Sequence, residues 1–327
     1  MILYRVTFLS TKTILKMATI VDFFDKCRFW GWNRNPFLQA IKFYGISNFI
    51  VTKIANAVIP WYFKRTQNNK KYCIINEKKE GSRIIVSLTS YPVRIPTLWK
   101  VIECMLRQTV KPDKIVLYLT ESQIGDIEKI PSSLLNLRSR GLEIRLCKEE
   151  IRSHTKYFQA FQDFPNDLVI TVDDDLFYRS DLIENHLRWH NKYPKCISAN
   201  WAKEILPTIP LYDDWLDVKQ AGVSNRYLFL GVSSVLYPPH CMYKDVFNVD
   251  MIKKLCLTAD DVWLSCMAIL AKTPVCFTGY QFHHLPVLIK NNTTLISING
   301  ERNQICVDNL NKWYKEKLNV RPFVDLV

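Results

Sequence analysis

The ten cysteines of this 327-residue chain include no Cys-x-x-Cys pair, and they are scattered through apolar segments such as VIECML, residues 101–106. This scatter excludes the usual spacing of a structural zinc site and does not suit a disulfide framework. Buried free thiols in a reducing compartment fit the pattern better.

A long uninterrupted apolar run is also missing from the N-terminus. Residues 1–24 are largely apolar but are broken by Arg5, Lys12 and Lys16. They therefore lack the compact core of a signal peptide and the 18 or more apolar residues of a membrane-spanning helix. We expect a cytoplasmic protein.

Internal repeats and low-complexity tracts are absent, and 48% hydrophobic with 23% charged residues is ordinary for a folded protein. The net charge of +13 is concentrated: residues 1–80 hold 14 Lys or Arg against four Asp or Glu, which accounts for ten of the thirteen charges. A nucleic-acid-binding protein is the non-enzymatic interpretation of this charge. The N-terminus is too apolar for that role and has no dense basic cluster.

The basic N-terminal region has apolar residues at helical spacing over 8–24 and 35–59, with Pro36 suited to a helix start. Basic helices rich in Trp and Phe often lie on anionic membrane surfaces. A helical subdomain packed on the core is the equally weighted alternative. Polar residues 65–82 are expected to form a linker.

Strands and helices are predicted to alternate from residue 83. Continuous apolar strands alternating with helices favour a mostly parallel sheet covered on both faces, an α/β fold. In such sheets ligands bind beyond the carboxyl ends of the strands. The predicted strands are 83–91, 114–120, 142–148 and 167–175, and the predicted helices are 97–109, 131–141 and 155–164.

Three consecutive acids, Asp173, Asp174 and Asp175, follow the fourth predicted strand. In an extended backbone Asp173 and Asp175 point to one side, which makes a hard-oxygen site suited to Mg²⁺ or Mn²⁺. The alternative is that the acids cap the next helix. Ser180 already stands at that cap position, so the sequence favours a metal or ligand site.

A second acidic pair, Asp260 and Asp261, begins the apolar run VWLSCMAIL. Thr258 followed by acids also fits a helix-capping box, which is the structural alternative to a catalytic role. The two roles are compatible, because a helix N-terminus favours an ionised carboxylate.

The chain resembles the bacterial family-2-like glycosyltransferases over residues 83–285. That family has the nucleotide-sugar-binding GT-A fold and builds capsule, O-antigen (lipopolysaccharide) and related surface polysaccharides. The motifs that carry the resemblance occur in order along the chain: VSLTSYPVRI (86–95), RQTVKPDKIVLYLT (107–120), TVDDDLFY (171–178), VLYPP (235–239) and ADDVWL (259–264).

The resemblance implies roles for the triple acid as an Asp-x-Asp motif. Asp173 would face the donor nucleotide and sugar, and Asp175 would coordinate the divalent ion with help from Asp174. The end of the first strand would hold the nucleoside through Thr89, Ser90, Tyr91 and Arg94. Lys156 and Tyr157 would approach the donor.

The resemblance also implies that Asp261 is the general base toward the acceptor hydroxyl, with Asp260 beside it. One of His283 and His284 would be a late metal ligand, and a packing or surface role is the alternative for both. The chain departs from the family where a glycine-rich stretch lines the acceptor side, because Ser233 and Ser234 stand there instead.

We therefore expect a metal-dependent, inverting glycosyltransferase of the hexosyltransferase type. Its donor would be a UDP-sugar, and its acceptor a saccharide or lipid-linked saccharide at the inner membrane face. The expected division is a basic helical region with linker (1–80), a GT-A domain (81–290) and a C-terminal helical tail (291–327). A nucleotidyltransferase acting on sugar phosphates is the enzymatic alternative, although its usual glycine-rich loop is missing between residues 82 and 124.

Overall fold

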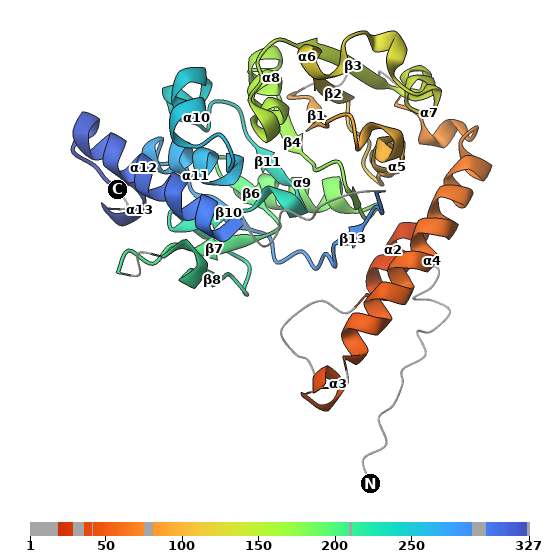
Figure 1. Ribbon diagram of the computed structural model, residues 1–327, viewed down its shortest axis with the longest axis horizontal. Coiled ribbons are helices and arrows are strands. Elements are labelled where there is room, and N and C mark those ends of the chain that lie inside the picture. Colours follow the sequence, from red (N-terminus) through yellow and green to blue (C-terminus); the bar gives the residue numbers. More distant parts are fainter. Residues whose placement is uncertain are drawn as a thin grey trace.

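A mixed sheet of eight strands runs through the centre of the protein, with helices on both faces (Figure 1). The computed structural model describes residues 19–28, 36–40, 42–74, 81–208, 211–289 and 299–325. Six strands share one direction, while β11 and β9 run opposite to their neighbours. The predicted α/β class, a mostly parallel sheet flanked by helices, is confirmed. The strands in spatial order are β3 (Leu142–Cys147), β2 (Lys114–Thr120), β1 (Ile84–Thr89), β4 (Leu168–Thr171), β11 (Val235–Tyr237), β6 (Ile197–Ala199), β12 (Val275–Phe277) and β9 (Gly222–Ser224).

Both faces of β1 are buried, which explains its continuous apolar sequence. Val86 and Leu88 point into the core beneath α5 (Ile95–Leu106), whereas Ile85 packs against α8 (Thr155–Asp163) on the other face. Because successive strand side chains alternate between faces, a strand covered on both sides must be apolar at every position.

The second half of the core surrounds helix α11 (Asp260–Leu270). Its residues from Val262 to Ile269 are all buried, as expected for a helix that is hydrophobic all round. Helix α12 (Asn299–Leu318) covers it through Leu310 and Tyr314. The tail is thus helical in the part that the structure describes.

Two small sheets and several short helices complete the protein. The three-stranded sheet is β10 (Tyr227–Phe229), β7 (Ala202–Glu204) and β8 (Leu216–Asp217), and the two-stranded sheet is β13 (Leu285–Pro286) with β5 (Leu176–Phe177). The remaining α-helices of the main domain are α6 (Glu121–Ile124), α7 (Ser132–Leu135), α9 (Leu182–Lys192), α10 (Val249–Leu255) and α13 (Pro322–Asp325).

Most predicted elements of the α/β region are found, and two differ. The predicted helix 131–141 is a short α-helix followed by a 3₁₀ segment that ends at Gly141, whose φ of 114° favours glycine. The predicted strand 167–175 ends as β4 at Thr171. The chain then bends at Asp174 and Asp175, because the next two residues pair with β13.

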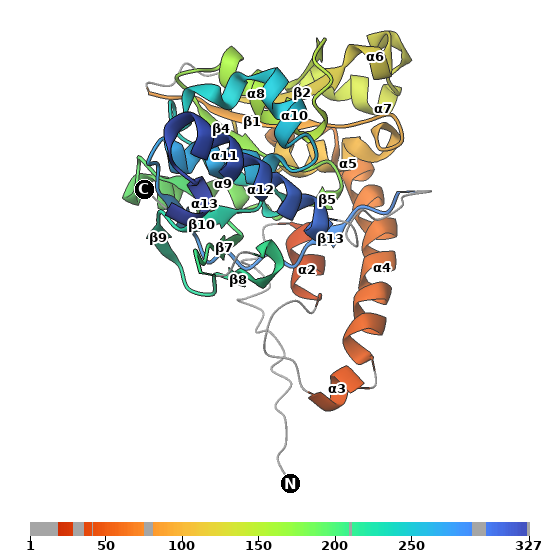
Figure 2. The same cartoon turned by 60° about the vertical axis from the view of Figure 1, so that its left-hand side comes forward.

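The basic N-terminal region contributes three helices: α2 (Ile20–Lys26), α3 (Pro36–Ala40) and α4 (Phe43–Thr66). Helix α3 begins at Pro36 as predicted, but the expected helix 35–59 is interrupted before Lys42, whose φ of 56° is left-handed. Figures 1 and 2 show α3 and the start of α4 extending away from the sheet, while the end of α4 reaches α5. The expected helix over residues 8–24 falls mostly outside the described residues.

One side of α4 belongs to the main core. Ala55, Ile59 and Phe63 are fully buried in the same apolar cluster as the sheet residues Val86 and Leu88. The described part of the N-terminal region therefore packs on the core, as one of the two alternatives expected. Whether residues 1–80 form a separate domain stays a prediction.

The ten cysteines all lie in the described residues and are all free, and eight of them are buried. The scattered spacing therefore correctly predicted buried thiols. None of the helices in the described parts of the chain is long and apolar enough to cross a membrane.

Candidate functional site

The triple acid forms a bend between β4 and β5, at the carboxyl ends of β1 and β4. The Asp173 N–H donates to the Tyr178 hydroxyl at 2.8 Å, and that hydroxyl donates to the Val232 carbonyl at 3.2 Å. Tyr178 thus fixes the backbone of the bend against the loop before β11. Nothing in the spacing of the acids identified this role of Tyr178.

Arg94, just before α5, pairs with two of the three acids. One of its guanidinium nitrogens contacts Asp174 Oδ1 and lies 3.0 Å from Asp175 Oδ2. The Ser90 hydroxyl donates to the other Asp174 oxygen at 2.5 Å. Buried Asp174 is therefore a structural link between the end of β1 and the bend, and the guanidinium lies over the Tyr91 ring at 5.1 Å.

The arrangement differs from the alternation expected of a continuous strand. Asp174 and Asp175 share Arg94, whereas Asp173 turns toward Lys156. The backbone bend explains the difference, because strand alternation holds only while the chain is extended.

Lys156 joins the triple acid to the second acidic pair. Its Nζ lies 2.8 Å from Asp173 Oδ1 and 3.1 Å from Asp260 Oδ2, although the side chain is almost fully buried. Burial alone lowers the pKa of Lys156, but Asp173, Asp260 and Asp261 outweigh it and raise the pKa well above its ordinary value. Lys156 is therefore a buried permanent cation among carboxylates.

The position of Lys156 is set by its own backbone. Lys156 lies in the first turn of α8, and its carbonyl accepts a 2.5 Å hydrogen bond from the Ser87 hydroxyl of β1. A polar serine within the apolar strand IIVSLT is the sequence signal for this contact.

Asp261 lies in the first turn of α11 and contacts the loop before β11. The Gly231 N–H donates to Asp261 Oδ1 at 2.9 Å. A Cβ at position 231 would stand 2.8 Å from that oxygen, so the approach requires glycine. Gly231 is a further residue of the site that the sequence did not identify.

The two acids of α11 titrate differently. Burial raises the pKa of Asp261 to about 8, and the neighbouring Asp260 adds to the rise. Burial also acts on Asp260, but Lys156 outweighs it and holds the pKa of Asp260 below its ordinary value. Neighbouring carboxyls with opposite shifts are typical of acid–base sites.

The helix-capping alternatives do not describe these acids. The residue before α11 is Ala259, which makes no side-chain cap, and the Thr258 hydroxyl instead contacts Cys306 Sγ at 3.9 Å. Likewise, Ser180 does not cap α9, because its hydroxyl donates to Asp22 at 2.7 Å.

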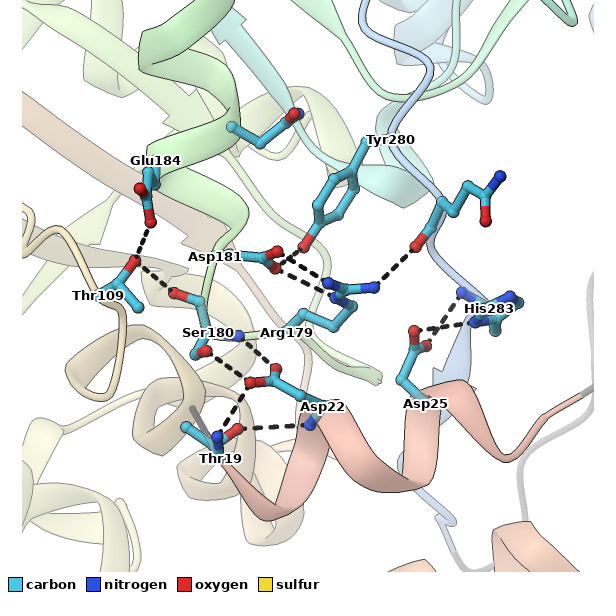
Figure 3. Close-up of polar contacts among 12 residues, drawn as sticks. Thr19, Asp22, Asp25, Thr109, Arg179, Ser180, Asp181, Glu184, Tyr280 and His283 are labelled. Carbon is cyan, nitrogen blue, oxygen red and sulfur yellow. Dashed lines mark hydrogen bonds and ion pairs between the residues drawn. The ribbon is translucent and has the colours of Figure 1, made fainter. Parts of the chain in front are cut away.

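His283 is directed toward helix α2 (Figure 3). Its Nδ1 lies 3.1 Å from Asp25 Oδ2, and its backbone N–H donates to Asp25 Oδ1 at 3.0 Å. Arg28 also donates to the His283 carbonyl at 3.1 Å. These contacts hold the 283–284 segment from outside the site.

His284 faces the acidic side. Its Nε2 lies 2.5 Å from the Ser233 hydroxyl, and its ring packs 5.1 Å from that of Trp201. Burial lowers the pKa of His284 to about 4, while Asp173 acts in the opposite direction. A neutral imidazole is the form that binds metals, and His283 is already held by Asp25, so His284 is the better candidate for a ligand role.

Two predicted donor-binding residues have their hydroxyls bonded elsewhere. The Thr89 hydroxyl donates to the Tyr118 carbonyl of β2 at 2.9 Å. Tyr157 is fully buried, and its hydroxyl lies 2.8 Å from His154 Nδ1. The structure thus brings together Ser90, Tyr91, Arg94, Lys156, the three acids of the bend, Asp260, Asp261 and His284, but it does not bring the Thr89 and Tyr157 hydroxyls to them.

No group of three or more His, Cys, Asp or Glu side chains is arranged around a common metal position in the described residues. The donor set nevertheless fits a divalent cation. Asp173 and Asp175 are partly exposed carboxylates, and carboxylate oxygens are the hard ligands that such cations prefer. Burial raises the pKa of Asp175 to about 6, and the charge of Asp173 adds to the rise although Arg94 opposes it.

Two cavities lie away from these residues. One of about 200 Å³ is lined by apolar groups such as Phe161, Tyr237 and Phe247, and one of about 270 Å³ lies between Lys64, Trp99 and their neighbours. Neither is lined by a predicted site residue.

The described residues therefore define an α/β protein with an acidic site, bridged by a buried lysine, at the carboxyl edge of its sheet. No family model matches the sequence, and no curated protein matches it.

Solved structures with a partly similar arrangement were found. A mannosyltransferase from Pyrobaculum calidifontis in complex with GDP-Man and Mn²⁺ is 13% identical, with 85% of this chain and 78% of that chain covered at a TM-score of 0.41. A CMP:2-keto-3-deoxy-manno-octonic acid synthetase complexed with CTP is 11% identical (71% and 100% covered, TM-score 0.39). An apo UDP-glucose pyrophosphorylase is 11% identical (72% and 99%, TM-score 0.34). These similarities are too low to assign an activity, and the α/β class rests on the chain's own strands and helices.

Proposed function

We propose that this protein is a metal-dependent, inverting glycosyltransferase that moves a sugar from a UDP-sugar to a saccharide or lipid-linked saccharide in surface glycan synthesis. One observation carries the proposal: Lys156 Nζ bridges Asp173 and Asp260, at 2.8 and 3.1 Å. The two acidic motifs, 87 residues apart in sequence, thereby become parts of one site. Glycosyl transfer needs a cation beside the departing diphosphate and a base beside the acceptor hydroxyl, so the two acidic motifs must lie in one site.

The donor side of the site consists of the bend and the end of β1. Asp173 and Asp175 would hold the divalent cation, with His284 as the further candidate ligand. When bound, Mn²⁺ or Mg²⁺ supplies positive charge for the departing diphosphate. Tyr91 and Arg94 lie next to the acids and form the proposed contact for the nucleoside.

The acceptor side is built around Asp261. The Gly231 N–H occupies its Oδ1, so Oδ2 is the oxygen proposed to receive the proton of the acceptor hydroxyl. Only the ionised form of Asp261 can act in this way, and that form becomes the major one as pH rises through about 8, the raised pKa of Asp261. As that proton moves to Asp261, the hydroxyl oxygen bonds to the anomeric carbon. The bond from that carbon to the diphosphate oxygen breaks on the opposite side, and its electron pair leaves with the diphosphate.

Titration calorimetry with UDP, with and without Mn²⁺, tests the donor site. We expect binding that requires Mn²⁺ and that weakens more than about tenfold in Asp175→Ala, because one of the two proposed carboxylate ligands is removed. Asp325→Ala is the matched control, since Asp325 has the same 31% side-chain exposure and also pairs with an arginine. Binding of another nucleoside diphosphate instead would change the donor base, and no nucleotide binding at all would refute the proposal.

A nucleotidyltransferase acting on sugar phosphates is the second candidate, because two carboxylates and a metal at a sheet edge serve that reaction equally well. The products distinguish the two enzymes. Release of UDP from a UDP-sugar on adding an acceptor supports the glycosyltransferase, whereas release of inorganic diphosphate from a nucleoside triphosphate and a sugar phosphate supports the alternative.

A further inference from the structure

Helix α4 is apolar on two opposite sides, yet the described residues cover only one of them. Ala55, Ile59 and Phe63 are fully buried against the core. The opposite side carries large apolar side chains that are 48–65% exposed: Ile46, Phe49, Ile50, Ile54 and Trp61. We call these five residues the α4 face. A helix that is hydrophobic all round is normally covered all round, so something outside the described chain should cover this face.

The charge around the α4 face has one sign. No Asp or Glu occurs between Lys26 and Glu77, whereas residues 36–74 hold six exposed cations. Four of them lie on α4 or directly before it: Lys42, Lys53, Lys64 and Arg65. The Lys53 ammonium lies 5.4 Å from the centre of the Phe49 ring. Apolar and aromatic side chains among cations, without acids, match the interface of an anionic lipid bilayer.

A second copy of the chain fits this surface less well. Pairing two α4 faces would bring lysines of both copies together, and the helix offers no carboxylate to compensate them. The buried side of α4 also prevents lipid from surrounding the helix, so the face would lie in the plane of the membrane surface.

We infer that the α4 face docks on the headgroup region of an anionic lipid bilayer. The inference deepens the proposed function, on which it rests for one link only: docking would place the acidic site near a lipid-linked acceptor.

The region around α4 is physically connected to the acidic site. Asn56 of α4 donates to the Pro286 carbonyl and accepts from the Leu288 N–H, both at 2.8 Å. These bonds hold β13, which pairs with β5 directly after Asp175. Asp25 of α2 holds the adjacent His283 (Figure 3). A surface bound at α4 is thus two contacts away from the bend that carries the acids.

Co-sedimentation of the full chain with vesicles tests the inference. Vesicles of phosphatidylcholine with one quarter phosphatidylglycerol should bind the protein, and pure phosphatidylcholine vesicles should bind it much less. The double variant Phe49→Ser with Ile50→Ser should lose more than about tenfold in partitioning, because two large apolar side chains are no longer buried in the interface. Leu211→Ser with Leu216→Ser is the matched control, since both leucines are more than half exposed on the main domain, and it should bind like wild type.

A charge variant separates the electrostatic contribution to vesicle binding from the apolar contribution. Lys42→Gln with Lys53→Gln should lose about fivefold per lysine on the anionic vesicles and nothing on phosphatidylcholine alone. Added salt should weaken wild-type binding in the same direction.

Three results would overturn the inference: no binding to anionic vesicles, binding that the Phe49/Ile50 variant leaves unchanged, or a dimer in light scattering that this variant dissociates. Circular dichroism on the same samples confirms that the variant is folded. Calorimetry with UDP distinguishes the failures, because vesicle binding without nucleotide binding would refute the proposed function and leave the membrane face in place.

Discussion

Lys156 determines the electrostatics of the site at the scale of single residues. A buried ammonium requires compensating charge, and here the carboxylates come from two different segments, Asp173 and Asp260. Removing the cation would leave like charges facing one another. The same contact therefore holds the two acidic motifs together and keeps the pKa of Asp260 below its ordinary value.

Gly231→Ala tests the close approach of the loop to Asp261. A Cβ would meet Asp261 Oδ1 at 2.8 Å, so the loop or the carboxylate must shift. We expect a loss of about 1–3 kcal/mol in the free energy of unfolding, measured by urea titration. Gly45→Ala is the control, because a Cβ there meets nothing within 4 Å and position 45 is helical. That variant should gain up to about 1 kcal/mol. Equal effects at the two glycines would contradict the contact.

Asp261→Asn tests the pKa of the proposed base through stability. In the folded protein Asp261 keeps its proton up to about pH 8, whereas the unfolded chain loses it near the ordinary pKa of 3.8. The folded state therefore binds more protons, and the contribution of Asp261 to the free energy of unfolding is lost as pH rises from about 4 through 8. The asparagine variant removes this loss, so its stability relative to wild type should increase with pH over that range.

Asp260→Asn should change the pH dependence of stability in the opposite direction. Lys156 holds the pKa of Asp260 below its ordinary value, so this carboxylate stabilises the fold above that value and its contribution is lost as pH falls. The variant should be less stable than wild type at neutral pH and converge with it in acid. Identical pH profiles of the two variants, measured by thermal unfolding in a pH series, would contradict the assignment of the two carboxyls.

At the scale of secondary structure, local pattern predicted most of the sheet. The strand β2 has the predicted bounds, and α8 and β3 differ from the prediction by one residue at most. The end of β4 was not predictable, because its last predicted residues pair with neither neighbour and instead lead into β5. That pairing depends on β13, more than 100 residues later. Capping residues failed for the same reason, since Ser180 and Thr258 bond to distant segments.

The residues of the site likewise divide into those that the sequence could identify and those that it could not. The acidic residues could be named from their motifs, because their chemistry is visible in sequence. Lys156 was named through the resemblance, which implied a donor contact and not the bridge between Asp173 and Asp260. Gly231 and Tyr178 could not be named, because their roles consist of backbone contacts that only the tertiary structure makes. The sequence likewise did not show that His283 and His284 face different ways, because the buried Asp25 of α2 sets the orientation of His283.

Ser234 tests the strain in the segment where the resemblance expects glycine. Its φ of 78° and ψ of 145° belong to a region almost reserved for glycine, and its hydroxyl lies 3.2 Å from His186 Nε2. Ser234→Ala and Ser234→Gly both remove that hydroxyl, so their difference isolates the backbone. We expect the glycine variant to be more stable than the alanine variant by about 1 kcal/mol in urea unfolding, since strain relief exceeds the flexibility of glycine in the unfolded chain. An alanine variant of equal or greater stability would contradict the strain.

At the scale of the whole molecule, the basic N-terminal region has two different sides. Charge composition distinguishes residues 1–80 from a nearly balanced remainder, and their separation as a domain stays a prediction. It could not predict which helix side faces the protein, because both sides of α4 are apolar. The structure distinguishes them: Ala55, Ile59 and Phe63 complete the main core, while the α4 face stays exposed.

Phe63→Ala tests whether this region and the sheet form one cooperative unit. Phe63 is fully buried in the cluster that contains Val86 and Leu88, so its truncation leaves a cavity beneath the sheet. We expect a loss of about 3–5 kcal/mol in the free energy of unfolding, with circular dichroism and tryptophan fluorescence reporting one coincident transition. Trp61→Ala is the control on the same helix, since Trp61 is 65% exposed and should change stability by less than about 0.5 kcal/mol. If Phe63→Ala instead split unfolding into two transitions, α4 would fold apart from the sheet, and the link from the α4 face to the acidic site through β13 would be lost with it.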